Sequence, residues 1–158
     1  MDESERERLE RLRALAPQML GAIPHARALG LEITRVEIGR IWGKAPYRPE
    51  IIGDPQSGVI AGGVLTTLLD NLSGMAVHSA VETFEGIATL DLRIDYMRPA
   101  EPGHDVLAMA HCYKLARSVA FVRGIAYERD PEDPVAHSTA VFMLQLGRKP
   151  GQNLRPRK

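Results

Sequence analysis

The chain has 158 residues, of which 44% are hydrophobic and 25% are charged, and its 20 basic side chains balance 20 acidic ones. These values predict one soluble globular domain, and the balanced charge argues against nucleic acid or a membrane as a partner. Cys112 is the only cysteine, which excludes an intramolecular disulfide and fits a reducing compartment. The charged N-terminus has no apolar signal core, and no run is apolar enough to span a membrane, so we expect a cytoplasmic protein.

The N-terminal segment has the pattern of an amphipathic helix over residues 3–20. Apolar side chains recur there at helical spacing between alternating glutamates and arginines. Gly21 and Pro24 are expected to end this helix. We therefore predict a helical extension over residues 1–24, ahead of the main domain.

Residues 31–47 have the alternation that is typical of a strand. The alternation changes phase between two apolar pairs, Leu31/Ile33 and Val36/Ile38. A phase change within a strand predicts a β-bulge or a sharp bend near Arg35. Residues 48–60 contain several prolines and glycines and are predicted to form a loop.

A central helix is predicted over residues 62–80. One arc of its helical wheel is apolar and consists of Leu65, Leu68, Leu69, Leu72, Met75 and Ala76. The opposite arc consists of Thr66, Thr67, Asp70, Ser73, Gly74 and His78. This second arc lacks the lysines and glutamates of a solvent-exposed face. We infer that both faces are covered, one by the domain's own sheet and the other by a second subunit.

The sequence after Gly86 is rich in strands. Four are predicted, at residues 90–97, 106–113, 119–127 and 135–146. Short turns between successive strands imply an antiparallel sheet, so the fold class is α+β, with a long central helix wrapped by that sheet. This domain is predicted over residues 25–147, followed by a basic, disordered tail over residues 148–158.

Asp70 is the only charged side chain between Pro55 and Val81. An unpaired carboxylate is costly to bury, so such a residue usually serves chemistry or one specific partner. Eight residues earlier, Gly62 and Gly63 begin the same helix and leave backbone N–H groups bare, which favours an oxyanion or a polarised carbonyl. Asp70 is therefore a candidate general base or nucleophile. A hydrogen bond across a subunit interface is the structural alternative.

Several other kinds of site are excluded by their missing motifs. The chain has no nucleophile elbow, no complete phosphate-binding loop and no dinucleotide-binding fingerprint. Its five histidines lack the paired spacing of metal ligands, so we expect no metal site and assign them surface or structural roles.

Three segments resemble the PaaI-like branch of the hotdog-fold acyl-CoA thioesterases. Residues 60–70 are similar to the family's glycine pair, aliphatic run and aspartate, and residues 91–100 to its strand ending in Tyr-x-x-Pro-Ala. Residues 114–121 are similar to a hairpin with a basic residue, a hydroxyl and an Ala-Phe pair. The resemblance covers roughly residues 30–147, which suits one domain, and implies a hotdog fold.

The resemblance also implies roles for individual residues. Asp70 falls at the position of the catalytic carboxylate, and Gly62 at the position where a backbone amide polarises the thioester carbonyl, with Gly63 beside it at the substrate. Thr89 falls at a hydroxyl position that in some relatives holds the attacking water. Alternation would put Thr89 on one strand face with Asp91 and Arg93, so a plain solvent-facing threonine is an equal alternative.

Arg117 and Ser118 fall where relatives meet the phosphates of coenzyme A, although Arg117 also reads as a simple turn charge. Two positions depart from the family pattern. Ala61 stands where the family has a histidine, and Pro55 where many relatives have an asparagine. A slower enzyme, a different substrate or a binding protein therefore stays open.

The sequence thus predicts a homo-oligomer, a dimer or a dimer of dimers, that hydrolyses an acyl-CoA thioester at a cleft between subunits. Coenzyme A is part of the substrate, and no other cofactor is expected. The first alternative is a hotdog protein that binds an acyl or aryl ligand without turnover. A hydratase or dehydratase is less favoured, because it would require an aspartate and a histidine five residues apart, and Asp54, Asp91 and Asp105 lack such a partner.

Overall fold

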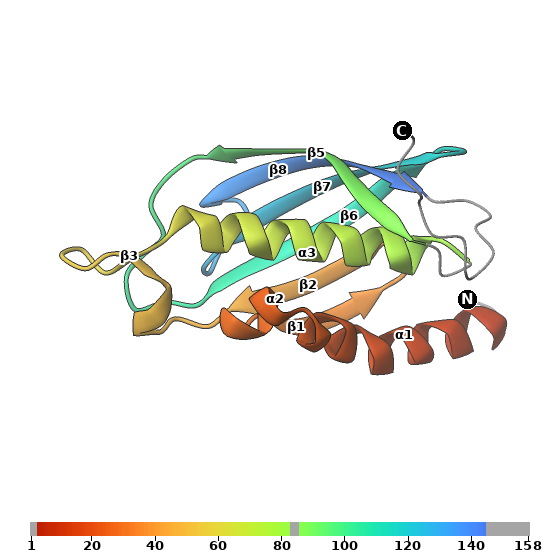
Figure 1. The fold of residues 1–158 in the computed structure, drawn as a ribbon, viewed down its shortest axis with the longest axis horizontal. Coiled ribbons are helices and arrows are strands. Elements are labelled where there is room, and N and C mark those ends of the chain that lie inside the picture. Colours follow the sequence, from red (N-terminus) through yellow and green to blue (C-terminus); the bar gives the residue numbers. More distant parts are fainter. Residues whose placement is uncertain (1–2, 83–85, 145–158) are drawn as a thin grey trace, which may run out of the picture.

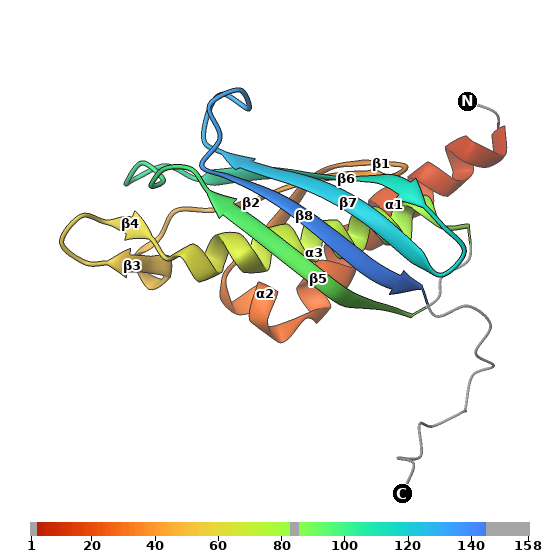
Figure 2. The same ribbon diagram turned by 90° about the horizontal axis from the view of Figure 1, so that it is seen from above.

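The structure is a computed structural model of the chain and describes residues 3–82 and 86–144. Six strands form its main sheet: β1 (Glu32–Glu37), β2 (Arg40–Ala45), β5 (Ile87–Tyr96), β6 (Val106–Leu115), β7 (Val119–Tyr127) and β8 (Ala136–Leu144). They are antiparallel and lie in the order β1, β2, β6, β7, β8, β5. A long helix, α3 (Gly62–Ala80), lies along one face of this sheet (Figure 1), and β5 forms one edge of it (Figure 2).

Helix α3 packs its apolar arc on the sheet, and both of its predicted ends are confirmed. The residues of that arc are buried, and so is Ser73, which the wheel assigned to the opposite arc. Glycines of the sheet allow the close approach of the helix. A Cβ atom on Gly43 would lie 2.8 Å from the side chain of Leu72, and one on Gly124 would lie 3.0 Å from that of Leu69.

Two further helices, α1 (Glu3–Ala22) and α2 (Pro24–Ala28), precede the sheet, and Figure 1 shows α1 beside β1. The first helix runs two residues past its predicted end, so Gly21 lies inside α1 and does not end it. Pro24 begins α2, since proline suits the first turn of a helix. The Arg8 guanidinium donates hydrogen bonds to the carbonyls of Ser79 (2.8 Å) and Val81 (2.6 Å) at the end of α3. Helix α1 is thereby fixed to α3.

The segment before α3 differs from the prediction in two ways. Residues 31–47 form two paired strands rather than one, because Gly39 takes a positive φ of 74° and reverses the chain. The predicted bulge is confirmed in β1, where the register shifts between Ile33 and Arg35. The predicted loop over residues 48–60 contains a 3₁₀ turn (Pro49–Ile51) and a short hairpin of β3 (Ile52–Asp54) and β4 (Val59–Ile60).

The four strands predicted after α3 are β5 to β8, and β5 begins three residues earlier than predicted. The boundaries proposed at residues 1–24 and 25–147 stay predictions, and the basic tail over residues 148–158 lies outside the described residues. In the part of the chain that the structure describes, no helix is long and apolar enough to cross a membrane.

Candidate active site

Asp70 lies in the middle of α3, and its side chain is partly exposed. The hydroxyl of Thr89 on β5 donates a hydrogen bond to Asp70 Oδ1 across 3.2 Å. The structure therefore brings together two of the predicted site residues, although they are 19 positions apart. A carboxylate that accepts a hydroxyl hydrogen bond has its remaining lone pairs available for another donor.

A β-bulge in β5 turns Thr89 toward α3. Thr89 pairs with Phe142, but Asp91 pairs with Val141, so Leu90 is the extra residue and is 56% exposed. The extra residue reverses the alternation. Thr89 therefore lies on the same face of the strand as Leu92, with Asp91 on the other. The expectation that Thr89 shares a strand face with Asp91 and Arg93 is wrong, because the bulge breaks the alternation. Thr89 is nevertheless exposed to solvent, so both interpretations of its role stay predictions.

Asp70 and Thr89 line a cavity of about 430 Å³, which we call the Asp70 pocket. It lies between α3, the start of β5 and the junction of α1 with α2. Its lining is mainly apolar and consists of Met19, Ala22, Ile23, Asp70, Asn71, Gly74, Met75, His78, Ile87, Thr89 and Phe142. Burial lowers the pKa of the His78 imidazole, which favours its neutral form in this pocket.

A second hollow, the outer groove, adjoins the Asp70 pocket. It shares Ile23, Asp70, Asn71 and Thr89 with the pocket and continues past His25, Thr66, Thr67 and Leu92. The carboxylate of Asp70 therefore lies where an apolar space meets a more polar one. This arrangement suits a substrate with an apolar part, a reactive polar group and a polar remainder.

Gly62 is the first residue of α3 and is exposed. The residue before it, Ala61, is extended and provides no side-chain hydrogen bond to cap the helix. The first N–H groups of an α-helix have no acceptor within the helix and carry the positive end of its dipole. The hydroxyl of Tyr96 donates to the Gly62 carbonyl at 2.9 Å, which fixes the orientation of the peptide between Gly62 and Gly63. Gly63 is exposed beside it.

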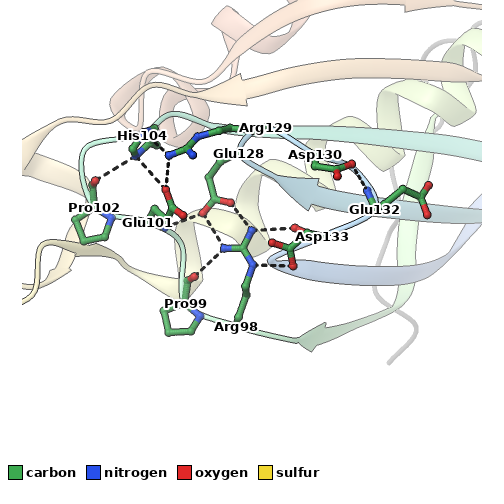
Figure 3. A network of polar contacts seen from close by, with 10 residues as sticks. All are labelled: Arg98, Pro99, Glu101, Pro102, His104, Glu128, Arg129, Asp130, Glu132 and Asp133. Atoms are coloured by element: carbon green, nitrogen blue, oxygen red, sulfur yellow. Dashed lines mark hydrogen bonds and ion pairs between the residues drawn. The ribbon is translucent and has the colours of Figure 1, made fainter.

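Gly62 lines a separate hollow of about 370 Å³, which we call the Gly62 hollow. Its lining consists of Val59, Ile60, Gly62, Leu65, Tyr96, Met97, Arg98, Pro99, Ala100 and Val135. The Arg98 guanidinium donates two hydrogen bonds to the Glu128 carboxylate, at 2.6 and 3.2 Å (Figure 3). The N–H of Glu101 donates a third at 2.7 Å. These bonds tie one wall of the Gly62 hollow to the end of β7.

Glu128 is the only charged residue that is buried in the described part of the chain. Burial alone would raise the pKa of its carboxyl, but the hydrogen bonds from Arg98 and from the Glu101 amide outweigh it and lower that pKa. The same pairing raises the pKa of the Arg98 guanidinium. Sequence analysis missed this pair, although Arg98 stands inside the segment over residues 91–100 that carries the family resemblance.

The remaining predicted residues do not meet Asp70 within one chain. Gly62 precedes Asp70 by eight residues of one helix, so their backbones are about 12 Å apart along the axis. Arg117 and Ser118 lie exposed in the turn between β6 and β7 and are not among the residues lining the three hollows. Within residues 3–82 and 86–144, no group of three or more His, Cys, Asp and Glu side chains could hold a metal ion.

Known proteins are similar to this chain in sequence and in fold. The family model described as the thioesterase superfamily matches residues 57–135, which is half of the chain. The medium/long-chain acyl-CoA thioesterase YigI of Salmonella typhimurium is 28% identical over 135 residues, covering 77% of this chain and 86% of that protein. Human acyl-coenzyme A thioesterase 13 is 38% identical over 64 residues, covering 40% of this chain and 45% of that protein.

Solved structures extend the similarity to most of the chain. A crystal structure of a Pseudomonas aeruginosa protein has a TM-score of 0.76 at 43% identity and covers 84% of this chain and 98% of its own. A mutant of the phenylacetic acid degradation protein PaaI from Thermus thermophilus has a TM-score of 0.66 at 27% identity, covering 76% of this chain and 97% of its own. The chain belongs to the thioesterase superfamily and has its hotdog fold.

Proposed function

We propose that this protein hydrolyses an acyl-CoA thioester to a carboxylic acid and coenzyme A. Membership of the thioesterase superfamily and the names of its relatives support the reaction class. The observation that carries the proposal is the position of Asp70, at the junction of an apolar pocket and a polar groove, with the Thr89 hydroxyl on its carboxylate. The acyl part fits the apolar side, and the thioester then lies beside the carboxylate.

In the proposed reaction, Asp70 takes a proton from water as the water oxygen attacks the thioester carbonyl carbon. The tetrahedral intermediate then expels the sulfur, and the proton leaves with the thiol, so that one water is consumed. The Thr89 hydroxyl orients the carboxylate and the water. Direct attack by the Asp70 carboxylate, followed by hydrolysis of the resulting anhydride, is the alternative route.

The Gly62 N–H is proposed to stabilise the negative charge that develops on the carbonyl oxygen. It stands at an uncapped helix N-terminus, where the helix dipole favours an anion. Because Gly62 and Asp70 of one chain are about 12 Å apart along the helix axis, a single carbonyl cannot lie beside both. The proposal therefore needs a second copy of the chain, which we take to be a dimer or a dimer of dimers.

The free edge of β5 supports such an assembly. This strand has 10 residues, and in the described sheet its only neighbour is β8. A long, unpaired edge is a ready template for another strand. In an antiparallel pair of two β5 strands, the Thr89 end of one lies beside the Tyr96 end of the other. Thr89 contacts Asp70 and Tyr96 contacts Gly62, so this pairing would bring the two halves of the site together.

Coenzyme A would extend from the site toward the solvent. Gly63 is proposed to contact the substrate beside Gly62. Arg117 is an exposed cation next to the exposed hydroxyl of Ser118, a combination that suits phosphate oxygens. The support for these proposed contacts is the family resemblance and the exposure of the three residues.

A second candidate function is the binding of an acyl-CoA without turnover. It is favoured by Ala61, which occupies the N-cap of α3 with a side chain that can donate no hydrogen bond to a carbonyl. Ligand binding without release of thiol would identify this function.

The test is the release of free thiol from short, long and aromatic acyl-CoAs by the wild type and by Asp70→Asn. General acid–base catalysis contributes about a hundredfold to ten-thousandfold to a rate, so we expect a loss in that range with the fold unchanged. Asp130→Asn, in the exposed turn between β7 and β8, is the matched control and should retain wild-type turnover. Equal rates for wild type and Asp70→Asn would remove Asp70 from the mechanism.

A further inference from the structure

We infer that Gly74 determines the length of acyl chain that the Asp70 pocket accepts, by leaving the space that a side chain would fill. The inference rests on the proposed function, because it takes the acyl group of the thioester as the occupant of the pocket. It is carried by three observations: the position of Gly74, the space around it and the wall opposite.

Gly74 lies one turn beyond Asp70 on α3 and lines the same pocket. His78 lies a further turn along, so the pocket follows the helix for about 12 Å from the carboxylate. A thioester with its carbonyl at Asp70 and its acyl chain in the apolar space would therefore extend past Gly74 toward His78. A short acyl group would end before Gly74, and a longer one would lie against its Cα.

The packing of the protein itself does not require a glycine at this position. A Cβ atom on Gly74 would lie 3.4 Å from Ile87 and 3.7 Å from Phe142, which is ordinary van der Waals contact. Its φ is not positive, so alanine could adopt the same backbone. By contrast, a Cβ atom on Gly43 would lie 2.6 Å from a backbone oxygen, and one on Gly124 would lie 3.0 Å from Leu69. Those two glycines are explained by close packing.

Glycine within a helix destabilises it relative to alanine. Gly74 therefore carries a cost in stability that the folded chain does not repay through its own contacts. The space it leaves opens into the Asp70 pocket between Ile87 and Phe142. An acyl chain is the occupant that suits this space, because both neighbouring side chains are apolar and the carboxylate stands at the entrance.

The opposite wall of the pocket is formed by Met19, Ala22 and Ile23, where α1 meets α2. The hydrogen bonds of Arg8 to the end of α3 hold α1 along this side. The pocket thus lies between two elements that are fixed to each other, so a methyl group added at Gly74 would reduce its volume.

The experiment measures kcat/KM for saturated acyl-CoAs of increasing length with the wild type, Gly74→Ala and Gly74→Val. One methylene in an apolar pocket changes specificity by about tenfold or more. We therefore expect Gly74→Ala to lower kcat/KM for the longest chains about tenfold, to change the shortest less than about twofold, and to raise the melting temperature by about 2–4 °C. Gly74→Val should shift the preference further toward short chains.

Gly21→Ala is the matched control, since a Cβ atom there would meet nothing within 4 Å, and it should leave the length preference unchanged. A folded Gly74→Ala with the wild-type length preference would overturn the inference. If the wild type releases no thiol from any acyl-CoA, the proposed hydrolysis fails instead. Calorimetric binding of the same acyl-CoAs then decides the role of Gly74: weaker binding of long chains by Gly74→Ala supports it, and equal affinities refute it.

Discussion

The Gly62 hollow and the Asp70 pocket lie along the same helix, but different forces hold their walls. Beside the Gly62 hollow, the Glu128 side chain is 3% exposed and accepts hydrogen bonds from Arg98 and from the Glu101 amide. Beside the Asp70 pocket, apolar side chains of α1, β5 and β8 form the wall together with Ile23, and the hydroxyl of Thr89 bonds to the carboxylate.

This difference separates a structural carboxylate from a candidate catalytic one. The hydrogen-bonding capacity of Glu128 is used in joining the segment after β5 to the end of β7, so it has little left for a substrate. Asp70 keeps capacity for a water molecule and faces two hollows. A buried, fully paired carboxylate indicates stability, whereas a sparsely paired one at a pocket indicates chemistry.

Among changes at the walls of the two hollows, the largest effect is expected from removing the N–H donor of the Gly62 hollow. Proline is tolerated at the first position of a helix, and Ala61 already has the extended backbone, with φ −61° and ψ 133°, that precedes a proline. Gly62→Pro should therefore fold but lose about a hundredfold to a thousandfold in kcat, as when one oxyanion donor is removed. The measurement is thiol release from an acyl-CoA.

Gly62→Ala is the control, because it adds a Cβ atom 3.4 Å from the Tyr96 ring and keeps the N–H. The two variants separate the effect of the donor from that of bulk. Gly62→Pro and Gly62→Ala of equal activity would show that the amide has no part in the reaction.

The next effect concerns the ion pair beside the same hollow. Glu128→Gln keeps the shape of the side chain but removes its charge. It also places an NH₂ group, itself a donor, against the donors of Arg98 and the Glu101 amide. We expect a loss of about 1–3 kcal/mol in the free energy of unfolding, with kcat reduced far less than in Gly62→Pro. Chemical denaturation measures the stability, and Glu132→Gln, an exposed neighbour, should be neutral. Unchanged stability in Glu128→Gln would contradict a structural role for Glu128.

Acid should lower the stability of the fold by protonating the Glu128 carboxylate beside the Gly62 hollow. Burial would raise the pKa of Glu128, but its hydrogen bonds lower it below the ordinary value of 4.5. A carboxyl with a lower pKa in the folded state stabilises the fold above the unfolded pKa, and this stability is lost as the pH falls through the folded value. Melting temperatures measured from pH 6 downward should therefore fall more for the wild type than for Glu128→Gln. Parallel pH profiles would exclude this linkage.

The sequence was sufficient for the elements that local patterns determine. The central helix was predicted with both ends, since an apolar arc, a glycine pair and a sudden change of periodicity mark it. The fold class and the strands after α3 followed from alternation and turn residues. The Asp70 candidate followed from one charge in an uncharged segment, and the structure adds that this charge lies at a pocket.

Contacts between distant segments could not be predicted in the same way. Leu90 continues the apolar alternation of Leu92, so nothing in the sequence reveals the bulge that turns Thr89 toward α3. The amphipathic pattern of α1 shows that one face is covered but not that its end lines a pocket. Arg98 and Glu128 are 30 residues apart, and their pairing depends on how the strands β5, β8 and β7 align.

The smallest effect is expected from the single contact that the bulge creates. Thr89→Val removes the hydroxyl that donates to Asp70 Oδ1 and keeps the shape of the side chain. A hydrogen bond of this kind contributes about 0.5–1.5 kcal/mol, so kcat should fall about twofold to tenfold. Because the hydroxyl orients the reacting groups, KM and the melting temperature should stay at their wild-type values. Thr89→Ser retains the hydroxyl and should recover most of the rate. If Thr89→Ser loses as much kcat as Thr89→Val, the effect comes from packing against the pocket and not from the hydrogen bond. Thr89 would then act on Asp70 through its shape alone.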